Sequence, residues 1–245
     1  MNDFKSNLNK TMFNEIYAYL KKWDLNKVDL LSRKIAEKTY LDKISRLSEG
    51  EIYSLIDGIT GGLGYRKGDF NVMRMGYCGS LIAWPEAIPE GGKVLEIGTG
   101  LGRTCYAAVE WAKPSLFLTL DNSPEILAIA LYRNPVKAFS EALKRSIVKI
   151  ALVDAVKAVN IISEKFDHII HDGGPNPGKN PRLYSKEFIE KLLQLLKPGG
   201  TLSIFAGRNK KWQNKIYFVL KSLGFTIETV SFPETPTLVF HALMK

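Results

Sequence analysis

The residues best placed to do chemistry lie in residues 93–104, which have the sequence KVLEIGTGLGRT. A short apolar run carries Glu96 near its end and is followed by glycines 98, 100 and 102, at every second position. This order is typical of a strand, a tight turn and a helix, where α/β proteins let a nucleotide-like ligand approach the backbone. Glycine suits such a turn because it accepts positive φ and has no Cβ to hold a ligand away.

A second acidic residue follows the glycine turn at a suitable distance. Asp121 ends the next apolar run, about 20 residues beyond the turn, where a carboxylate can accept hydrogen bonds from two ribose hydroxyls. Dinucleotide-binding turns are spaced G-x-G-x-x-G, whereas here Arg103 stands three residues after Gly100. The glycines alone discriminate weakly between ligands, so the rest of the chain has to decide.

Five segments, in order along the chain, resemble class I S-adenosylmethionine-dependent methyltransferases. Residues 93–104 resemble the first motif of that family, in which an acidic residue precedes alternating glycines. The other segments resemble its second strand, its adenine-holding turn, its fourth strand with the catalytic loop, and the turn before its fifth strand: residues 118–122, 153–155, 166–175 and 196–200.

This resemblance implies S-adenosylmethionine as the cofactor and a set of residues that bind it. Asp121 would hold the ribose and Asp154 the adenine, while the Glu96 carboxylate would favour the ammonium and sulfonium groups of the ligand. The predicted cofactor-binding set is Glu96, Gly98, Thr99, Gly100, Gly102, Asp121, Asn122, Asp154, Ala155 and Asp172. No metal ion is expected, because the two cysteines and three scattered histidines form no ligand cluster.

Two residues are predicted to face the acceptor as catalytic groups. Asp172 lies at the carboxyl end of a predicted central strand, where a carboxylate could act as the base for an amine or hydroxyl. Methyl transfer otherwise needs mainly proximity and orientation, worth roughly 7–11 kcal/mol. Residues 131–135, the Asp172 loop and residues 183–188 resemble archaeal predicted methyltransferases related to spermidine synthases, and this likeness adds Tyr184.

The chain also departs from these relatives, which leaves the acceptor open. Spermidine synthases carry G-G-G-D-G-G at the turn, and this chain has no aspartate there. Their second loop aspartate falls near Gly174 or Pro175, and the N-P-P-Y signature of many methyltransferases is missing. Methyl transfer to a small molecule or RNA is the leading hypothesis. Aminopropyl transfer to an amine, and non-catalytic RNA binding by a retained cofactor fold, are the alternatives.

Several of these residues also have simpler interpretations. Glu96 and Asp121 could be strand-end acids that only cap the segments that follow, and Asp154 could be only the N-cap of the next helix. Asp167 is expected to start a strand and stay solvated. His171 is expected to be a packed or solvated histidine, because it alternates to the other face of the strand from Asp172.

The elements that must position these residues alternate between strand and helix, which predicts a Rossmann-like, seven-stranded, mostly parallel sheet with an antiparallel last strand and helices on both faces. Strands are predicted at 93–97, 116–121, 147–153, 167–172, 200–205, 225–232 and 237–244. Helices are predicted at 103–113, 124–132, 155–163, 185–196 and 210–223.

The first third of the chain is predicted to form a separate substrate or lid element, residues 1–85, ahead of a cofactor domain, residues 86–245. Apolar spacing predicts helices over residues 5–57, with a capping box formed by Ser48 and Glu51. Residues 65–82 are glycine-spaced and are predicted to form a β-hairpin turning at Gly68-Asp69.

Composition narrows the class of protein less sharply. The 245 residues are 45% hydrophobic and 24% charged, typical of a folded globular chain, and no run of 18 apolar residues or signal-peptide pattern occurs. No membrane partner and a cytoplasmic location are therefore expected. The net charge of +9 fits either a polyanionic partner such as RNA or a lysine-rich solvated surface. The sequence allows a homo-oligomer without specifying one.

Overall fold

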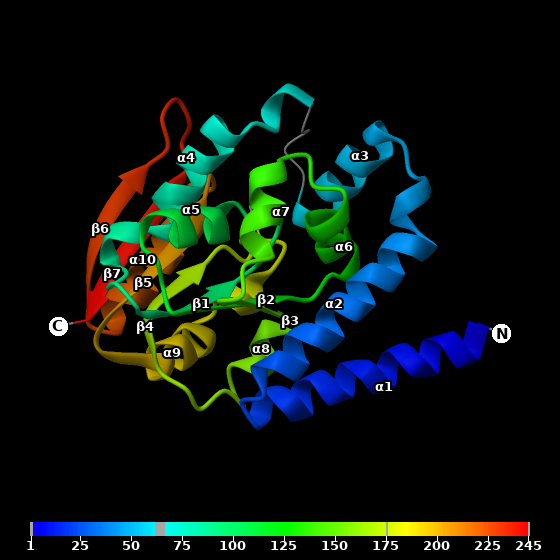
Figure 1. The fold of residues 1–245 in the computed structure, drawn as a ribbon. Coiled ribbons are helices and arrows are strands. Elements are labelled where there is room, and N and C mark those ends of the chain that lie inside the picture. Colours follow the sequence, from blue (N-terminus) through cyan, green and yellow to red (C-terminus); the bar gives the residue numbers. More distant parts are fainter. Residues whose placement is uncertain (1, 62–66, 175, 245) are drawn as a thin grey trace.

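One seven-stranded sheet organises the chain, with the strand order β3-β2-β1-β4-β5-β7-β6 (Figure 1). The computed structural model describes residues 2–61, 67–174 and 176–244. Strands β1 to β5 are mutually parallel, and β7 pairs antiparallel with both β5 and β6. The strands are β1 Lys93–Ile97, β2 Leu116–Asp121, β3 Val148–Leu152, β4 Phe166–His171, β5 Leu196–Gly207, β6 Phe225–Ser231 and β7 Leu238–Met244. The predicted mostly parallel sheet with an antiparallel last strand is confirmed.

Helices cover both faces of this sheet, with α4, α5 and α7 on one side and α8 and α9 on the other (Figure 1). The strands between them are almost wholly buried, as expected for parallel strands sandwiched between helices. The helices are α1 Asn2–Lys21, α2 Leu25–Asp42, α3 Glu49–Thr60, α4 Val72–Ala83, α5 Arg103–Trp111, α6 Pro124–Tyr132, α7 Lys137–Leu143, α8 Ala155–Ala158, α9 Lys186–Leu195 and α10 Lys210–Ser222. Among the helices described, none is long and apolar enough to cross a membrane.

The predicted β-hairpin at residues 65–82 is wrong for the part that is described, because that part is mainly the helix α4; residues 65 and 66 lie outside the described residues. The side chain of Asn71 accepts a hydrogen bond from the Arg74 amide and so caps the first turn. One of the glycines that indicated a hairpin serves helix packing instead. A Cβ on Gly79 would collide with the backbone of Arg103, so the glycine lets α4 approach the start of α5.

The first two helices close the outer edge of the sheet at β3. The Asp29 carboxylate accepts from the amide of Ile150 at 2.9 Å, and the Ser32 hydroxyl accepts from the amide of Leu152 at 2.9 Å. One residue pair further, just beyond the strand, the Tyr17 hydroxyl accepts from the Asp154 amide at 2.7 Å. Three side chains of α1 and α2 thus satisfy the outward N–H groups that an edge strand otherwise leaves unpaired.

Candidate active site

A cavity of about 380 Å³ opens at the carboxyl edge of the sheet, where β1, β2, β3 and β4 end. In open parallel sheets this edge is the usual place for a ligand. The cavity is also lined by residues of α3 and α4 and by the segment 179–183. Of the predicted cofactor-binding residues, the structure places these in its wall: Gly98, Thr99, Gly100, Asp121, Asn122, Asp154, Ala155 and Asp172.

The glycine turn brings β1, β4 and α5 closer together than residues with a Cβ could come. Gly98 has φ of 94°, and a Cβ there would collide with the carbonyl oxygen of Asp172. Gly102 has φ of 88° and does not line the cavity; a Cβ on it would lie 2.8 Å from the Leu143 side chain. Gly102 therefore packs α5 against α7, and only the first two glycines reach the cavity.

Asp121 is fixed across the mouth of the turn by backbone donors. One carboxylate oxygen accepts from the Gly100 amide at 3.1 Å and the other from the Ser123 amide at 2.9 Å. Burial raises the pKa of Asp121, and these backbone N–H groups oppose that shift. The Asp121 carboxylate also lines the cavity, so a ligand bound there could donate hydrogen bonds to it.

Asp154 combines the two roles that its position allowed. Its carboxylate accepts from the Val156 amide at 2.8 Å and caps the short helix α8. The same side chain lines the cavity beside Ala155. The predicted helix 155–163 is shorter, because α8 covers only Ala155–Ala158.

Glu96 does not reach the cavity, and the prediction that its carboxylate faces a cationic ligand is wrong in this structure. The side chain is fully buried behind the turn, where it accepts hydrogen bonds from the hydroxyls of Thr104 and Thr119. Burial raises the pKa of Glu96 to about 8. The group therefore keeps its proton at neutral pH and supports the turn from below, without presenting charge to a ligand.

Asp172 lies in the cavity wall, where Arg103 holds it. Two guanidinium nitrogens of Arg103 donate to its carboxylate at 3.0–3.3 Å, and the Asp172 side chain is only 10% exposed. Burial raises the pKa of Asp172, and the positive charge of Arg103 opposes the shift. Sequence reasoning missed Arg103 as a site residue, although it occupies the position where a dinucleotide turn has its third glycine.

Tyr184 was predicted to face the acceptor, but it does not line the cavity. Its side chain is fully buried, its hydroxyl donates to the Gly174 carbonyl at 3.4 Å, and its ring packs 4.5 Å from that of His171. Burial lowers the pKa of His171 to about 4, so the neutral ring donates from Nε2 to the Leu183 carbonyl at 2.7 Å. The expectation of a packed His171 is confirmed, and the two side chains hold the carbonyl groups of Gly174 and Leu183.

The cavity wall contains further residues that the sequence did not single out. Ile56, Ile59 and Thr60 of α3 and Met75 of α4 cover it from one side. Lys179 and Arg182 lie at its rim and are exposed. No local signal marks these residues, because the chain brings them to the cavity only by folding.

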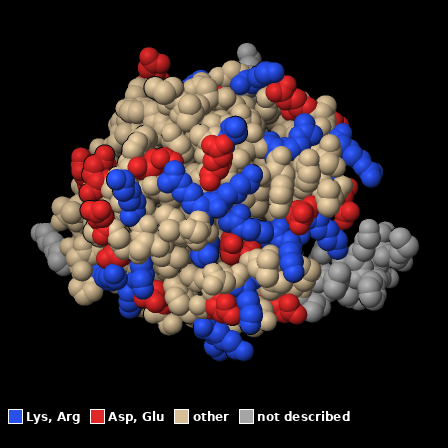
Figure 2. Space-filling model, in the orientation of Figure 1, with Lys and Arg blue, Asp and Glu red and all other residues tan. Residues whose placement is uncertain are grey.

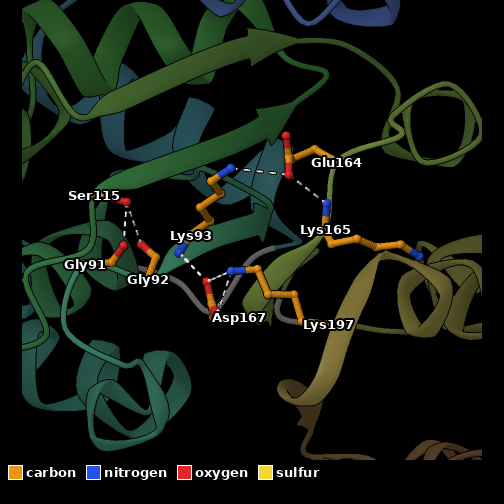
Figure 3. Close-up of polar contacts among 8 residues, drawn as sticks. All are labelled: Gly91, Gly92, Lys93, Ser115, Glu164, Lys165, Asp167 and Lys197. Carbon is orange, nitrogen blue, oxygen red and sulfur yellow. Dashed lines mark hydrogen bonds and ion pairs between the residues drawn. The ribbon is translucent and has the colours of Figure 1, made fainter.

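The opposite, amino edge of the sheet carries another acidic residue of β4. Asp167 accepts from both Lys197 at 2.8 Å and the Lys93 amide at 2.8 Å, and Lys93 pairs with Glu164 (Figure 3). Partial burial would raise the pKa of Asp167, but the hydrogen bonds from Lys197 and the Lys93 amide hold it below its usual value. Asp167 starts the strand region as predicted, and it is paired there instead of only solvated.

The charges elsewhere do not define a second candidate site. Figure 2 shows basic side chains gathered near the centre of one face, with acidic side chains among and around them. Within the described ranges, no group of three or more histidine, cysteine, aspartate or glutamate residues could hold a metal ion.

Comparisons with solved structures agree with this architecture. A spermidine synthase in complex with the transition-state analogue AdoDATO is similar with a TM-score of 0.60 at 18% identity, over 70% of this chain and 61% of that one. Spermidine synthase from Thermotoga maritima gives 0.57 at 18%, over 70% and 60%. Human methyltransferase-like protein 13 in complex with SAH gives 0.52 at 16%, over 71% and 81%. At these identities the likeness shows the Rossmann-like fold.

Two comparisons of sequence each match part of this chain. The uncharacterized protein MJ1233 of Methanocaldococcus jannaschii is 32% identical over 146 residues, 56% of this chain and 48% of that protein. The chain thus spans about half the length of the curated relative it matches. Residues 128–231, from α6 to β6, match the family described as S-adenosyl-L-methionine-dependent methyltransferase, which confirms the resemblance found in the sequence.

Proposed function

We propose that this chain is an S-adenosylmethionine-dependent methyltransferase. One observation carries the proposal: acidic residues at or just beyond the carboxyl ends of β2, β3 and β4 all line a single cavity beside the glycine turn. The match of residues 128–231 to a methyltransferase family supports it independently.

The cavity residues fit such a donor. Asp121 presents a carboxylate to the cavity, which suits two ribose hydroxyls, and Asp154 and Ala155 line the neighbouring wall, where the adenine would lie. S-adenosylmethionine, when bound, supplies an electrophilic methyl group on its sulfonium sulfur. The Gly98 and Gly100 backbone forms the wall along which the methionine part would lie.

Asp172 would orient the acceptor and take its proton. The methyl carbon would exchange its bond to sulfur for a bond to the acceptor atom, and the donor would become S-adenosylhomocysteine. The raised pKa makes the Asp172 carboxylate a better base than an exposed one, while the positive charge of Arg103 favours its ionised form and orients it. Tyr184 would act as a positioning residue, since its hydroxyl bonds only the Gly174 carbonyl among described groups.

Residues 1–85 would contribute the substrate side of the site. The side chains of Ile56, Ile59 and Met75 form an apolar cover over the cavity, opposite the strand ends. Such a cover excludes water from a transfer that water would compete for.

The decisive experiment is calorimetric titration of the protein with S-adenosylmethionine. Asp121→Ala should weaken binding by about 10- to 100-fold, because charge-assisted hydrogen bonds are lost. Asp42→Ala, which removes an exposed carboxylate from the end of α2, is the matched control and should leave the affinity unchanged. Equal affinity of the Asp121→Ala variant and the wild type would overturn the assignment.

Further measurements separate the alternatives. Aminopropyl transfer requires tighter binding of decarboxylated S-adenosylmethionine than of the parent compound. A non-catalytic RNA-binding role requires RNA affinity that falls steeply with salt and a labelled methyl group that is never transferred.

A further inference from the structure

The charges around the cavity are divided between two walls. Asp121, Asp154 and Asp172 line the strand-end wall, where the proposed donor would lie. Lys179 and Arg182 line the rim formed by the segment that follows β4. The acids and the rim cations therefore present opposite charge to different parts of one bound complex.

The two rim cations are not used elsewhere in the described structure. Arg103 is committed to Asp172, whereas no ion pair or side-chain hydrogen bond among the described residues involves the Lys179 ammonium or the Arg182 guanidinium. Most exposed lysines and arginines are merely solvated. These two differ because they belong to the wall of the cavity that holds the proposed donor and base.

The rim segment is tied to the end of β4, and so to Asp172. Asn180 Nδ2 donates to the Gly173 carbonyl at 3.3 Å, and the His171 ring donates to the Leu183 carbonyl at 2.7 Å. The backbone is also turned on itself, with the Asn180 amide bonded to the Pro177 carbonyl at 3.2 Å. Cations on an anchored segment lose less freedom when they bind a ligand, so they are suited to recognition.

We propose that the methyl acceptor is a small molecule carrying a carboxylate or phosphate group, which Lys179 and Arg182 bind at the rim while its reacting atom faces Asp172. This inference rests on the proposed function and names the substrate class of that site. An arginine fork matches a carboxylate or phosphate in two-point geometry, and a lysine adds a second charge. A polyamine, the acceptor in aminopropyl transfer, is itself cationic and would be repelled by these two cations. The inference therefore argues against aminopropyl transfer at this site.

A compact anion fits better than a nucleic acid. A polynucleotide needs a basic track that follows several phosphates. The rim offers two cations, and on the face in Figure 2 the basic group has acidic side chains among it.

The test uses the full chain saturated with S-adenosylhomocysteine, titrated at low salt with inorganic pyrophosphate, with tricarballylate and with putrescine. Pyrophosphate represents a phosphate source and tricarballylate a carboxylate source. At least one anion should bind, and the double variant Lys179→Gln/Arg182→Gln should bind it about tenfold more weakly. The matched control Lys34→Gln/Lys144→Gln removes two exposed charges away from the cavity and should bind like the wild type.

The readouts distinguish failure of the inference from failure of the proposed function. S-adenosylhomocysteine affinity tests the donor site, and it should stay within about twofold in both double variants, because neither removes a donor contact. Three outcomes would overturn this inference and leave the proposed function standing. The protein could bind the donor but neither anion, it could bind putrescine more tightly than the anions, or its anion affinity could fall equally in both double variants. A short single-stranded RNA that binds more tightly than both anions, and equally in both double variants, would also overturn it.

Discussion

The two ends of β4 hold aspartates whose pKa values are shifted in opposite directions. Asp167, at the amino edge, pairs with Lys197, and hydrogen bonds hold its pKa below the usual value. Asp172, just beyond the carboxyl end, pairs with Arg103, yet burial raises its pKa. Two ion pairs of similar length therefore differ in what surrounds them. The amino edge uses charge to stabilise the fold, whereas the carboxyl edge keeps a charge in a setting that disfavours it, as functional sites commonly do.

The largest effect should come from replacing each aspartate by asparagine. Asp172→Asn removes the proposed base and should slow methyl transfer by about 10²–10⁴-fold. Asp167→Asn should leave the rate unchanged. Transfer of radiolabelled methyl from S-adenosylmethionine into a deproteinised cell extract measures both. Similar rates in the two variants would show that Asp172 contributes no more to methyl transfer than Asp167 does.

Removing the basic partners should separate the two pairs in stability. Arg103→Met leaves the largely buried Asp172 carboxylate unpaired and should lower the free energy of unfolding by about 2–4 kcal/mol. Lys197→Met breaks a pair whose lysine is 41% exposed, and should cost about 0–1 kcal/mol. Urea unfolding measures both values. A larger loss for Lys197→Met would reverse the comparison.

The pH dependence of stability should have opposite sign at the two edges. Glu96, beneath the carboxyl edge, has its pKa raised to about 8, so its contribution is present below pH 4.5 and is lost as pH rises toward 8. Asp167 has a lowered pKa, so its contribution is present above its usual pKa near 4 and is lost as pH falls below it.

Two variants test this sign. The Glu96→Gln side chain cannot ionise. At pH 9 the free energy of unfolding of this variant, measured with urea, should exceed that of the wild type by about 1–3 kcal/mol, and the difference should be smaller at pH 5. Asp167→Asn should be less stable than the wild type at pH 7, and the difference should shrink at pH 3. The contrast fails if the Glu96→Gln effect is the same at pH 5 and pH 9.

The smallest effect should come from Tyr184→Phe. The hydroxyl makes one long hydrogen bond to Gly174 and does not reach the cavity, so the rate should fall less than about threefold and stability by less than about 1 kcal/mol. A hundredfold loss of rate with unchanged stability would restore Tyr184 as a catalytic residue.

The positions of the strands could be predicted where local pattern and burial coincide. β1, β2 and α6 have the predicted bounds, because apolar runs there end at an acid, a glycine turn or a Ser-Pro cap. The helix α7 was not predicted, since it is short and its N-cap, Val136, makes no side-chain bond. The hairpin failed at α4 because glycine spacing signals turns and close helix packing alike.

The site was predicted less completely, for a physical reason. Asp121 is the last residue of β2 and Asp154 lies two residues beyond β3, so their place at the cavity follows from parallel pairing. Glu96 lies one residue before the strand end, and the direction of its side chain depends on Thr104 and Thr119. Arg103 and the rim cations became site residues only through contacts between distant segments.

The hydrogen bonds between side chains of α1 and α2 and the edge of β3 have a thermodynamic consequence for the site. The last of these hydrogen bonds joins the Tyr17 hydroxyl of α1 to the backbone amide of Asp154, the residue proposed to hold the adenine. If donor binding tightens the Asp154 turn, it must strengthen the docking of α1 by the same factor by which docked α1 strengthens donor binding, because coupling between two sites is reciprocal. The first helix of the chain would then report donor occupancy, and its protease sensitivity would fall as the cavity fills.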